Sequence, residues 1–238
     1  MSTISVHGTK RDVDPHGALS DWFDPTHTVI VSIDMHEGHL SDHPACPCPA
    51  PRGRAIVQPI DDFHRAARAL GIPVVHVRSE LRASGIDDVQ GTSDSAWRTT
   101  FPQHVGPIPG AADHALAGSR WTRFVTEVEP QDEIVTGKKR LSAFYPTDLD
   151  FLLRQMGARA VVLDGIMADC CVLNSAFDAS NLGYRVSVVS DLVRGTDEGL
   201  ERAALSMVSL HLGVVTESTE LLAAWALTSE RRPEHRPA

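Results

Sequence analysis

The chain has 238 residues, of which 42% are hydrophobic and 22% are charged, and its formal net charge is -9. This length fits one sizeable α/β domain, and an acidic balance without a dominant basic tract argues against nucleic-acid binding. Residues 1–24 are polar, and no stretch approaches the roughly 20 apolar residues that a membrane span needs. The sequence therefore predicts a cytoplasmic protein with no signal peptide and no membrane contact.

Strand and helix patterns alternate along the chain after an expected N-terminal extension, residues 1–25. A nearly continuous apolar run at 28–34 predicts a buried strand. A helix is expected over about 54–70, where apolar residues recur on one face before Gly71, and a second strand over 72–77. Residues 79–131 show weak periodicity and many Gly, Pro, Ser and Asp, so we expect a long connection that faces the substrate.

The same alternation continues to the end of the chain. Further strands are expected at 133–136, 158–163, 184–190 and 214–216. Further helices are expected at 146–156, 169–182, 197–212 and 220–227. This order predicts a three-layer α/β/α fold with a six-stranded, mostly parallel sheet. The domain should span 26–228, and the charged, proline-containing tail, 229–238, should be disordered.

Three chemically capable residues follow predicted strands: Asp34, Lys138 and Cys171. Binding sites in parallel sheets form at the carboxyl ends of the strands, so these side chains are candidates for one site. Cys171 is expected on the first turn of a helix, where the unpaired N–H groups and the helix dipole favour a thiolate. The same N–H groups can hold the oxyanion that forms when a thiolate attacks a carbonyl. The pattern indicates a cysteine hydrolase.

Each of these residues also has a plainer structural interpretation. Asp34 suits a carboxylate that fixes a loop, Lys138 a solvated basic turn, and Cys171 a small buried hydrophobe. Cys170 adds a further alternative, because both adjacent thiols cannot be the nucleophile. Neighbouring helix positions point about 100° apart, so one thiol should face the strand ends while the other packs inside.

The other two cysteines, Cys46 and Cys48, lie in a proline-rich stretch. Two adjacent pairs do not form a disulfide framework, and a chain of this length does not need one. A zinc site would require a second ligand pair at a usable spacing, which the sequence does not offer. We expect an ordinary exposed loop here.

Four segments together resemble the isochorismatase-like cysteine hydrolase superfamily, which includes nicotinamidases, biuret-type hydrolases and N-carbamoylsarcosine amidohydrolases. They read VSIDMH at 31–36, KKRLSAFYPTDL at 138–149, GIMADCCV at 165–172 and AFDASNLGY at 176–184. The resemblance covers about 28–216 and implies an α/β hydrolase fold. Members of this superfamily commonly form dimers or tetramers, so a homo-oligomer is expected.

The resemblance also implies roles for particular residues. It gives the catalytic set as Asp34, Lys138 and Cys171, because the family lysine lies six residues before Phe144 and the family cysteine directly precedes a valine. It implies a cis peptide between Ile166 and Met167. The backbone N–H groups of Met167 and Cys171 would then form the oxyanion hole.

The chain departs from the family pattern at several positions. His36 stands where glutamine is common and Ala168 where threonine is usual, and His39 follows close by. We expect His36, His39 and Phe144 to bind substrate; the alternative for the two histidines is that they cap the loop or bond backbone carbonyls. Nicotinamidases carry a D-x-H metal motif after the second strand, which residues 76–82 lack. We therefore expect no metal and no cofactor.

The sequence thus predicts a cysteine-dependent hydrolase that forms a thioester with a small amide, ureido or carbamoyl compound and releases ammonia or an amine. Its partner would be a small-molecule substrate. Two alternatives stay open: hydrolysis of a vinyl ether, as in true isochorismatases, and a non-catalytic member of the fold.

Overall fold

The computed structural model describes residues 1–88 and 93–230, and its centre is one eight-stranded sheet of order β2-β1-β8-β7-β6-β3-β4-β5. The strands are β1 Ser2–Val6, β2 Thr9–Val13, β3 Thr28–Ile33, β4 Val74–Ser79, β5 Glu133–Lys138, β6 Ala160–Ile166, β7 Arg185–Arg194 and β8 Gly213–Thr216. The helices are α1 Ser20–Phe23, α2 Glu37–Leu40, α3 Val57–Ala69, α4 Ser93–Val105, α5 Leu149–Gln155, α6 Leu173–Asn181, α7 Glu198–Met207 and α8 Ser218–Glu230. The α/β class predicted from the alternation is confirmed.

The sheet has two more strands than predicted. Strands β3 to β8 pair in parallel, whereas β1 and β2 form an antiparallel hairpin that joins β8 through Ile4 opposite Thr216. His7 and Gly8 both have positive φ, at 47° and 76°, which is the backbone that a two-residue hairpin turn requires. The sequence of β2 is polar and lacks the apolar run of a buried strand, so residues 1–25 were expected to be an extension. In the structure β2 is a mostly exposed strand at the edge of the sheet.

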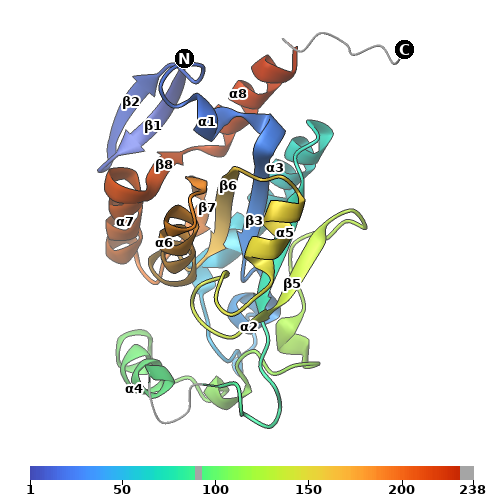
Figure 1. Cartoon of the computed structure of the whole chain (residues 1–238). Coiled ribbons are helices and arrows are strands. Elements are labelled where there is room, and N and C mark those ends of the chain that lie inside the picture. The colour runs from blue at the N-terminus through green and yellow to red at the C-terminus, as the bar shows by residue number, and fades with distance from the viewer. Residues whose placement is uncertain (89–92, 231–238) are drawn as a thin grey trace.

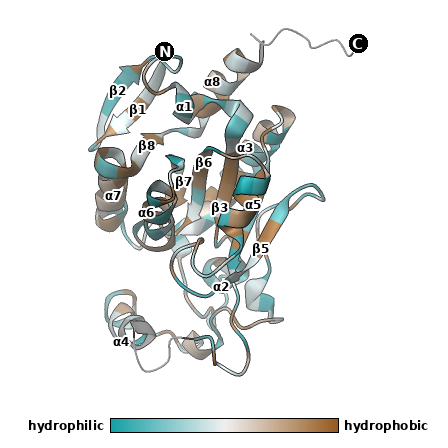
Figure 2. Ribbon diagram, in the orientation of Figure 1, coloured by the Kyte–Doolittle hydropathy of each residue, from teal (hydrophilic) through white to brown (hydrophobic). Residues whose placement is uncertain are grey.

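Helices cover both faces of the parallel strands (Figure 1). On one face, α3 and α8 pack against the sheet through Phe63, Trp225 and their apolar neighbours. On the other face, α5 and α6 contribute Leu153 and Ala176. The central strands between them, β3 and β6, are mostly apolar (Figure 2), and both are buried along their whole length. With both faces covered, the carboxyl edge of the sheet is the place where polar groups can gather.

Two segments differ locally from prediction. The 79–131 connection contains α4, which was not predicted because it contains Pro102 and has weak apolar periodicity. The predicted helix 169–182 opens with a π-helical turn, Ala168–Val172, before α6. Part of the tail predicted to be disordered, residues 231–238, lies outside the described residues. Within 1–88 and 93–230, no helix is both long and apolar enough to cross a membrane.

A buried polar cluster beside the core makes folding stability depend on pH. The side chain of His76 is buried on β4, with Nε2 3.1 Å from Asp132 Oδ2 and its ring packed edge-on to His64. Burial and the neighbouring His64 lower the pKa of His76 to about 4, although Asp132 and Asp164 oppose this. Asp132 is paired with Arg68 at 2.5 Å, so His76 stays neutral in the folded protein.

We expect this histidine to destabilise the fold in acid. Unfolded histidine takes up a proton near pH 6.5, whereas folded His76 does so only near its pKa of about 4. The contribution is therefore complete above pH 6.5 and declines as pH falls toward 4, by about 3 kcal/mol in all. Urea denaturation at pH 7 and pH 5 checks this, with His76→Gln beside wild type. An equal pH dependence in both proteins would contradict it.

Candidate active site

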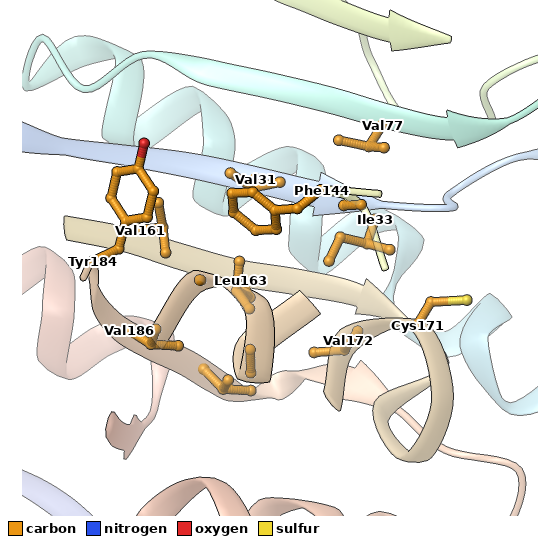
Figure 3. Packing of buried hydrophobic residues seen from close by; sticks show 14 of the residues in the cluster. Val31, Ile33, Val77, Phe144, Val161, Leu163, Cys171, Val172, Tyr184 and Val186 are labelled. Atoms are coloured by element: carbon orange, nitrogen blue, oxygen red, sulfur yellow. The ribbon is translucent and has the colours of Figure 1, made fainter. Parts of the chain in front are cut away.

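The carboxyl ends of β3, β5 and β6 bring Asp34, Lys138 and Cys171 together. Asp34 directly follows β3, Lys138 is the last residue of β5, and Cys171 lies in the π-helical turn after β6. All three side chains are buried, with exposed fractions of 0%, 2% and 6%. Figure 3 shows Cys171 at the end of a row of core residues, its sulfur directed away from them beyond the tip of β6. The structure thus groups the three residues predicted as the catalytic set.

The ammonium group of Lys138 lies at the centre of this group. Its Nζ is 2.6 Å from Asp34 Oδ2, 3.0 Å from Ser79 Oγ and 3.4 Å from Cys171 Sγ. An ammonium has three N–H donors and no acceptor, so these three partners account for its full hydrogen-bonding capacity. Lys138 therefore fixes the carboxylate and the thiol relative to each other.

Ser79, the last residue of β4, is a member of the site that the sequence reading missed. Its backbone N–H donates to Asp34 Oδ1 at 3.0 Å, and its hydroxyl donates to the same oxygen at 3.1 Å while accepting from Lys138. Both oxygens of Asp34 are thereby held. A serine at a strand end has no distinctive spacing, and the only available signal was its place at the carboxyl edge of the sheet.

We expect Ser79→Ala to lower kcat by about 10- to 100-fold. The substitution removes hydrogen bonds to Asp34 and Lys138, and a hydrogen bond to a charged group contributes about 1.5–3 kcal/mol. Because Ser79 positions other groups, Ser79→Thr, which keeps the hydroxyl, should retain most of the rate. Steady-state kinetics of both variants test this, and equal losses in the two would contradict a positioning role.

The charges of the site compensate one another. Burial by itself would raise the pKa of Asp34, but the Lys138 ammonium and His36 bring it well below its usual range. Burial likewise acts to lower the pKa of Lys138, and Asp34 together with Cys171 raises it instead. The resting pair is therefore a carboxylate and an ammonium. The pKa of the Cys171 thiol is raised by its hydrogen bond with Cys170 and by burial, with Lys138 opposing, so it rests as a thiol.

The expectation that one of the two adjacent cysteines faces the strand ends while the other packs inside is wrong. Cys170 and Cys171 both line the same cavity, although Cys170 is less buried. A π-helical turn spans Ala168–Val172, so the rotation between neighbours differs from that of a regular α-helix and one thiol need not turn inward. Lys138 nevertheless distinguishes them, since its ammonium is hydrogen-bonded to Cys171 Sγ.

The backbone just before the π-helical turn of Cys171 has a positive φ angle and a cis peptide bond. Gly165 has φ of +101°, and a Cβ atom there would lie 2.2 Å from the carbonyl oxygen of Ile33. Only glycine permits this approach of β6 to β3. One residue further on, the Ile166–Met167 peptide bond is cis. Met167 then leads into the turn, and its carbonyl accepts from the N–H groups of Cys170 and Val172.

A cavity of about 400 Å³ opens in front of these groups. Its walls combine Lys138 and Cys171 with residues of α2 and the loop after it, the 79–131 connection and the 138–141 segment. The lining residues are His39, Cys48, Ser79, Leu81, Asp88, Trp97, Phe101, His114, Lys138, Lys139, Arg140, Leu141, Met167, Asp169, Cys170, Cys171 and Thr196. Its size suits a small molecule.

The three predicted substrate-binding residues have different positions. His39 lines the cavity, and burial lowers its pKa to about 3, which keeps the ring neutral. His36 lies behind it, with ring centroids 4.6 Å apart, and is completely buried between the Trp121 carbonyl and Asp34. Phe144 does not line the cavity and packs in the core against Tyr184. The prediction that it binds substrate is therefore wrong. A motif match gave its position in the chain but not its direction.

The Cys46 and Cys48 segment also differs from the exposed loop that was expected. Both side chains are buried, at 4% and 6% exposure, and all four cysteines of the chain are free thiols. Cys46 Sγ donates to the carbonyl of Gly38 at 3.3 Å, whereas Cys48 faces the cavity. His114, from the aperiodic connection, reaches the same wall and was not anticipated.

The doubly covered parallel sheet, with a buried Asp–Lys–Cys group at its carboxyl edge, places the protein among α/β proteins that carry their site at the strand ends. The chain belongs to the isochorismatase family: the Isochorismatase domain matches residues 28–220.

Similar proteins support this placement. Ureidoacrylate amidohydrolase RutB of Methylobacterium radiotolerans is 31% identical over 64% of this chain, and the match spans 60% of that relative's length. N-carbamoylsarcosine amidase of an Arthrobacter species is 27% identical over 81% of this chain and 68% of its own. A cysteine hydrolase from Pseudomonas syringae pv. phaseolicola has a similar fold, with a TM-score of 0.73, 22% identity, and coverage of 86% and 94% of the two chains.

Proposed function

We propose that the protein is a cysteine-dependent hydrolase of a small amide, ureido or carbamoyl compound, which acts through a thioester and releases ammonia or an amine. The observation that carries this proposal is the buried group in which Lys138 Nζ joins Asp34 Oδ2 at 2.6 Å to Cys171 Sγ at 3.4 Å, on the wall of a cavity. The two curated relatives are named for amide and ureido chemistry, which agrees with C–N cleavage.

In the first half-reaction, the Asp34 carboxylate accepts the proton of the Cys171 thiol as the thiolate forms. Lys138 stays protonated and compensates the negative charge that moves between the two groups. The thiolate attacks the substrate carbonyl, and the backbone N–H groups of Met167 and Cys171 stabilise the oxyanion. As the C–N bond breaks, protonated Asp34 gives its proton to the departing nitrogen, which leaves a thioester.

In the second half-reaction, Asp34 acts as a base again. It accepts a proton from a water molecule, whose oxygen attacks the thioester carbonyl. Collapse of this intermediate breaks the C–S bond, releases the acid and returns the proton to Cys171. Asp34 begins the cycle as a carboxylate because Lys138 holds its pKa low, and the same ammonium then stabilises the negative charge as it moves to sulfur. The Cys171 thiol begins the cycle protonated, as a first step in which Asp34 takes its proton requires.

The proposal is tested by ammonia release from a panel of small amides, ureas and carbamoyl amino acids, with Cys171→Ala beside wild type. Release by the wild type alone supports a thiol amidohydrolase and gives its substrate class. No release from any compound by folded wild-type protein, or equal release by both proteins, would overturn it.

A further inference from the structure

A second group of reactive side chains lies on the wall of the catalytic cavity and takes no part in the mechanism above. It consists of His39 from α2, Cys48 from the loop that follows, and His114 from the connection between β4 and β5. One donor atom from each residue lies within 4.8 Å of the donors of the other two. The three come from separate parts of the sequence, none of them from residues 76–82, where the nicotinamidase motif would stand.

We propose that His39, Cys48 and His114 form a binding site for a divalent transition metal ion, with zinc the best match. Two imidazoles and one thiolate are borderline-soft ligands of the kind that zinc binds, and three protein ligands leave a fourth position open. A tetrahedral zinc site needs ligand separations of about 3.3–3.6 Å, and donors within 4.8 Å of one another would have to close by no more than about 1.5 Å around the ion.

Each of the two imidazoles has a ring nitrogen that is available to a metal ion. His39 Nδ1 lies 2.8 Å from the carbonyl oxygen of Cys48, so this nitrogen carries the proton and donates. Nε2 of His39 is then left with a free lone pair, the arrangement found in histidine ligands whose other nitrogen is held by a carbonyl. His114 Nε2 is buried and has no hydrogen-bond partner among the described residues. A bound ion would satisfy a nitrogen that otherwise bears a desolvation penalty.

A competing set of donors is less suitable. Asp34, His36 and His39 also lie within 4.8 Å of one another. The Asp34 carboxylate, however, is already paired with the Lys138 ammonium at 2.6 Å, and a cation placed beside it would be repelled by Lys138. Within the described residues, no lysine or arginine is hydrogen-bonded to Cys48 Sγ, and its thiolate would offset the charge of the ion. The open position of the ion would face the cavity, where it could hold a substrate oxygen or nitrogen.

Cobalt is a suitable probe, because a cobalt–thiolate bond gives a charge-transfer absorption in the near ultraviolet. Full-length protein is treated with a chelator and then titrated with Co²⁺. We expect one equivalent to bind with this absorption, and Zn²⁺ to abolish it by displacement. Cys48→Ser should remove the band, whereas Cys46→Ser, which alters a neighbouring buried thiol outside the cluster, should keep it. His114→Gln should weaken Co²⁺ binding by at least about 100-fold, since loss of a direct ligand should exceed the 10- to 100-fold effect of an outer partner.

Three results would overturn the site: no stoichiometric binding by wild type, a band that persists in Cys48→Ser, or a band lost in Cys171→Ala, which would place the cobalt at the catalytic thiol. Circular dichroism establishes that each variant is folded, and His114→Gln carries the test if Cys48→Ser does not fold. The titration needs no substrate, so its outcome is independent of the proposed hydrolysis.

Discussion

Replacing Cys171 with alanine is expected to lower kcat by at least about 10⁴-fold while leaving the protein folded. The thiol is the only side chain in the proposed mechanism that bonds covalently to substrate, and loss of the nucleophile in other hydrolases costs several orders of magnitude. The side chain is small and lies where the core meets the cavity wall, so losing its sulfur removes little packing. Amide hydrolysis by wild type and variant, with circular dichroism of both, measures the effect.

Cys170 provides the matched control for this experiment. It lines the same cavity as Cys171 but lacks the hydrogen bond from Lys138. Cys170→Ala should therefore stay within about tenfold of the wild-type rate, a limit set by the loss of one weak hydrogen bond to Cys171. Mass spectrometry during turnover of a slow substrate should find the acyl group on Cys171. A Cys171→Ala protein with the wild-type rate, or an acyl group on Cys170, would refute the assignment.

The sequence predicted the parts of the site that topology alone can place. Apolar strands alternating with helices require a parallel sheet, and Asp34, Lys138 and Cys171 each follow such a strand, so the rule for strand ends groups them. Ser79 obeys the same rule, but a serine carries no signal that separates it from an ordinary strand end. The hairpin of β1 and β2 escaped for a related reason, since a polar edge strand buries too little to leave an apolar run.

Side-chain direction and long-range packing were beyond the reach of the sequence. Phe144 lies in a segment with a clear motif, yet its ring packs into the core, because nothing in the spacing of a loop fixes where a side chain points. Cys48 and His114 are 66 positions apart, one in a proline-rich loop and one in an aperiodic connection. Only the folded chain brings them to one wall, so their relation to His39 could not be inferred beforehand.

Replacing Lys138 with methionine is expected to lower the free energy of unfolding by about 3–5 kcal/mol and kcat by at least about 100-fold. Lys138 is 2% exposed and pairs with Asp34, which is completely buried. Breaking a buried ion pair from one side leaves an uncompensated charge, which has a cost of this size. Burial would then raise the pKa of Asp34 and protonate it, so it could no longer accept the thiol proton. Urea denaturation and steady-state kinetics measure the two losses.

A second substitution separates the two effects of Lys138. In the double variant Asp34→Asn with Lys138→Met, no buried charge remains unpaired, so most of the lost stability should return while activity stays absent. The neighbouring lysine supplies the control: Lys139 pairs with Asp87, both side chains are partly exposed, and Lys139→Met should cost less stability than Lys138→Met. If the double variant were less stable than Lys138→Met alone, the pair would not be coupled as its geometry indicates. If it regained activity, Asp34 would not be the base, and the proton of Cys171 would have to leave by another route.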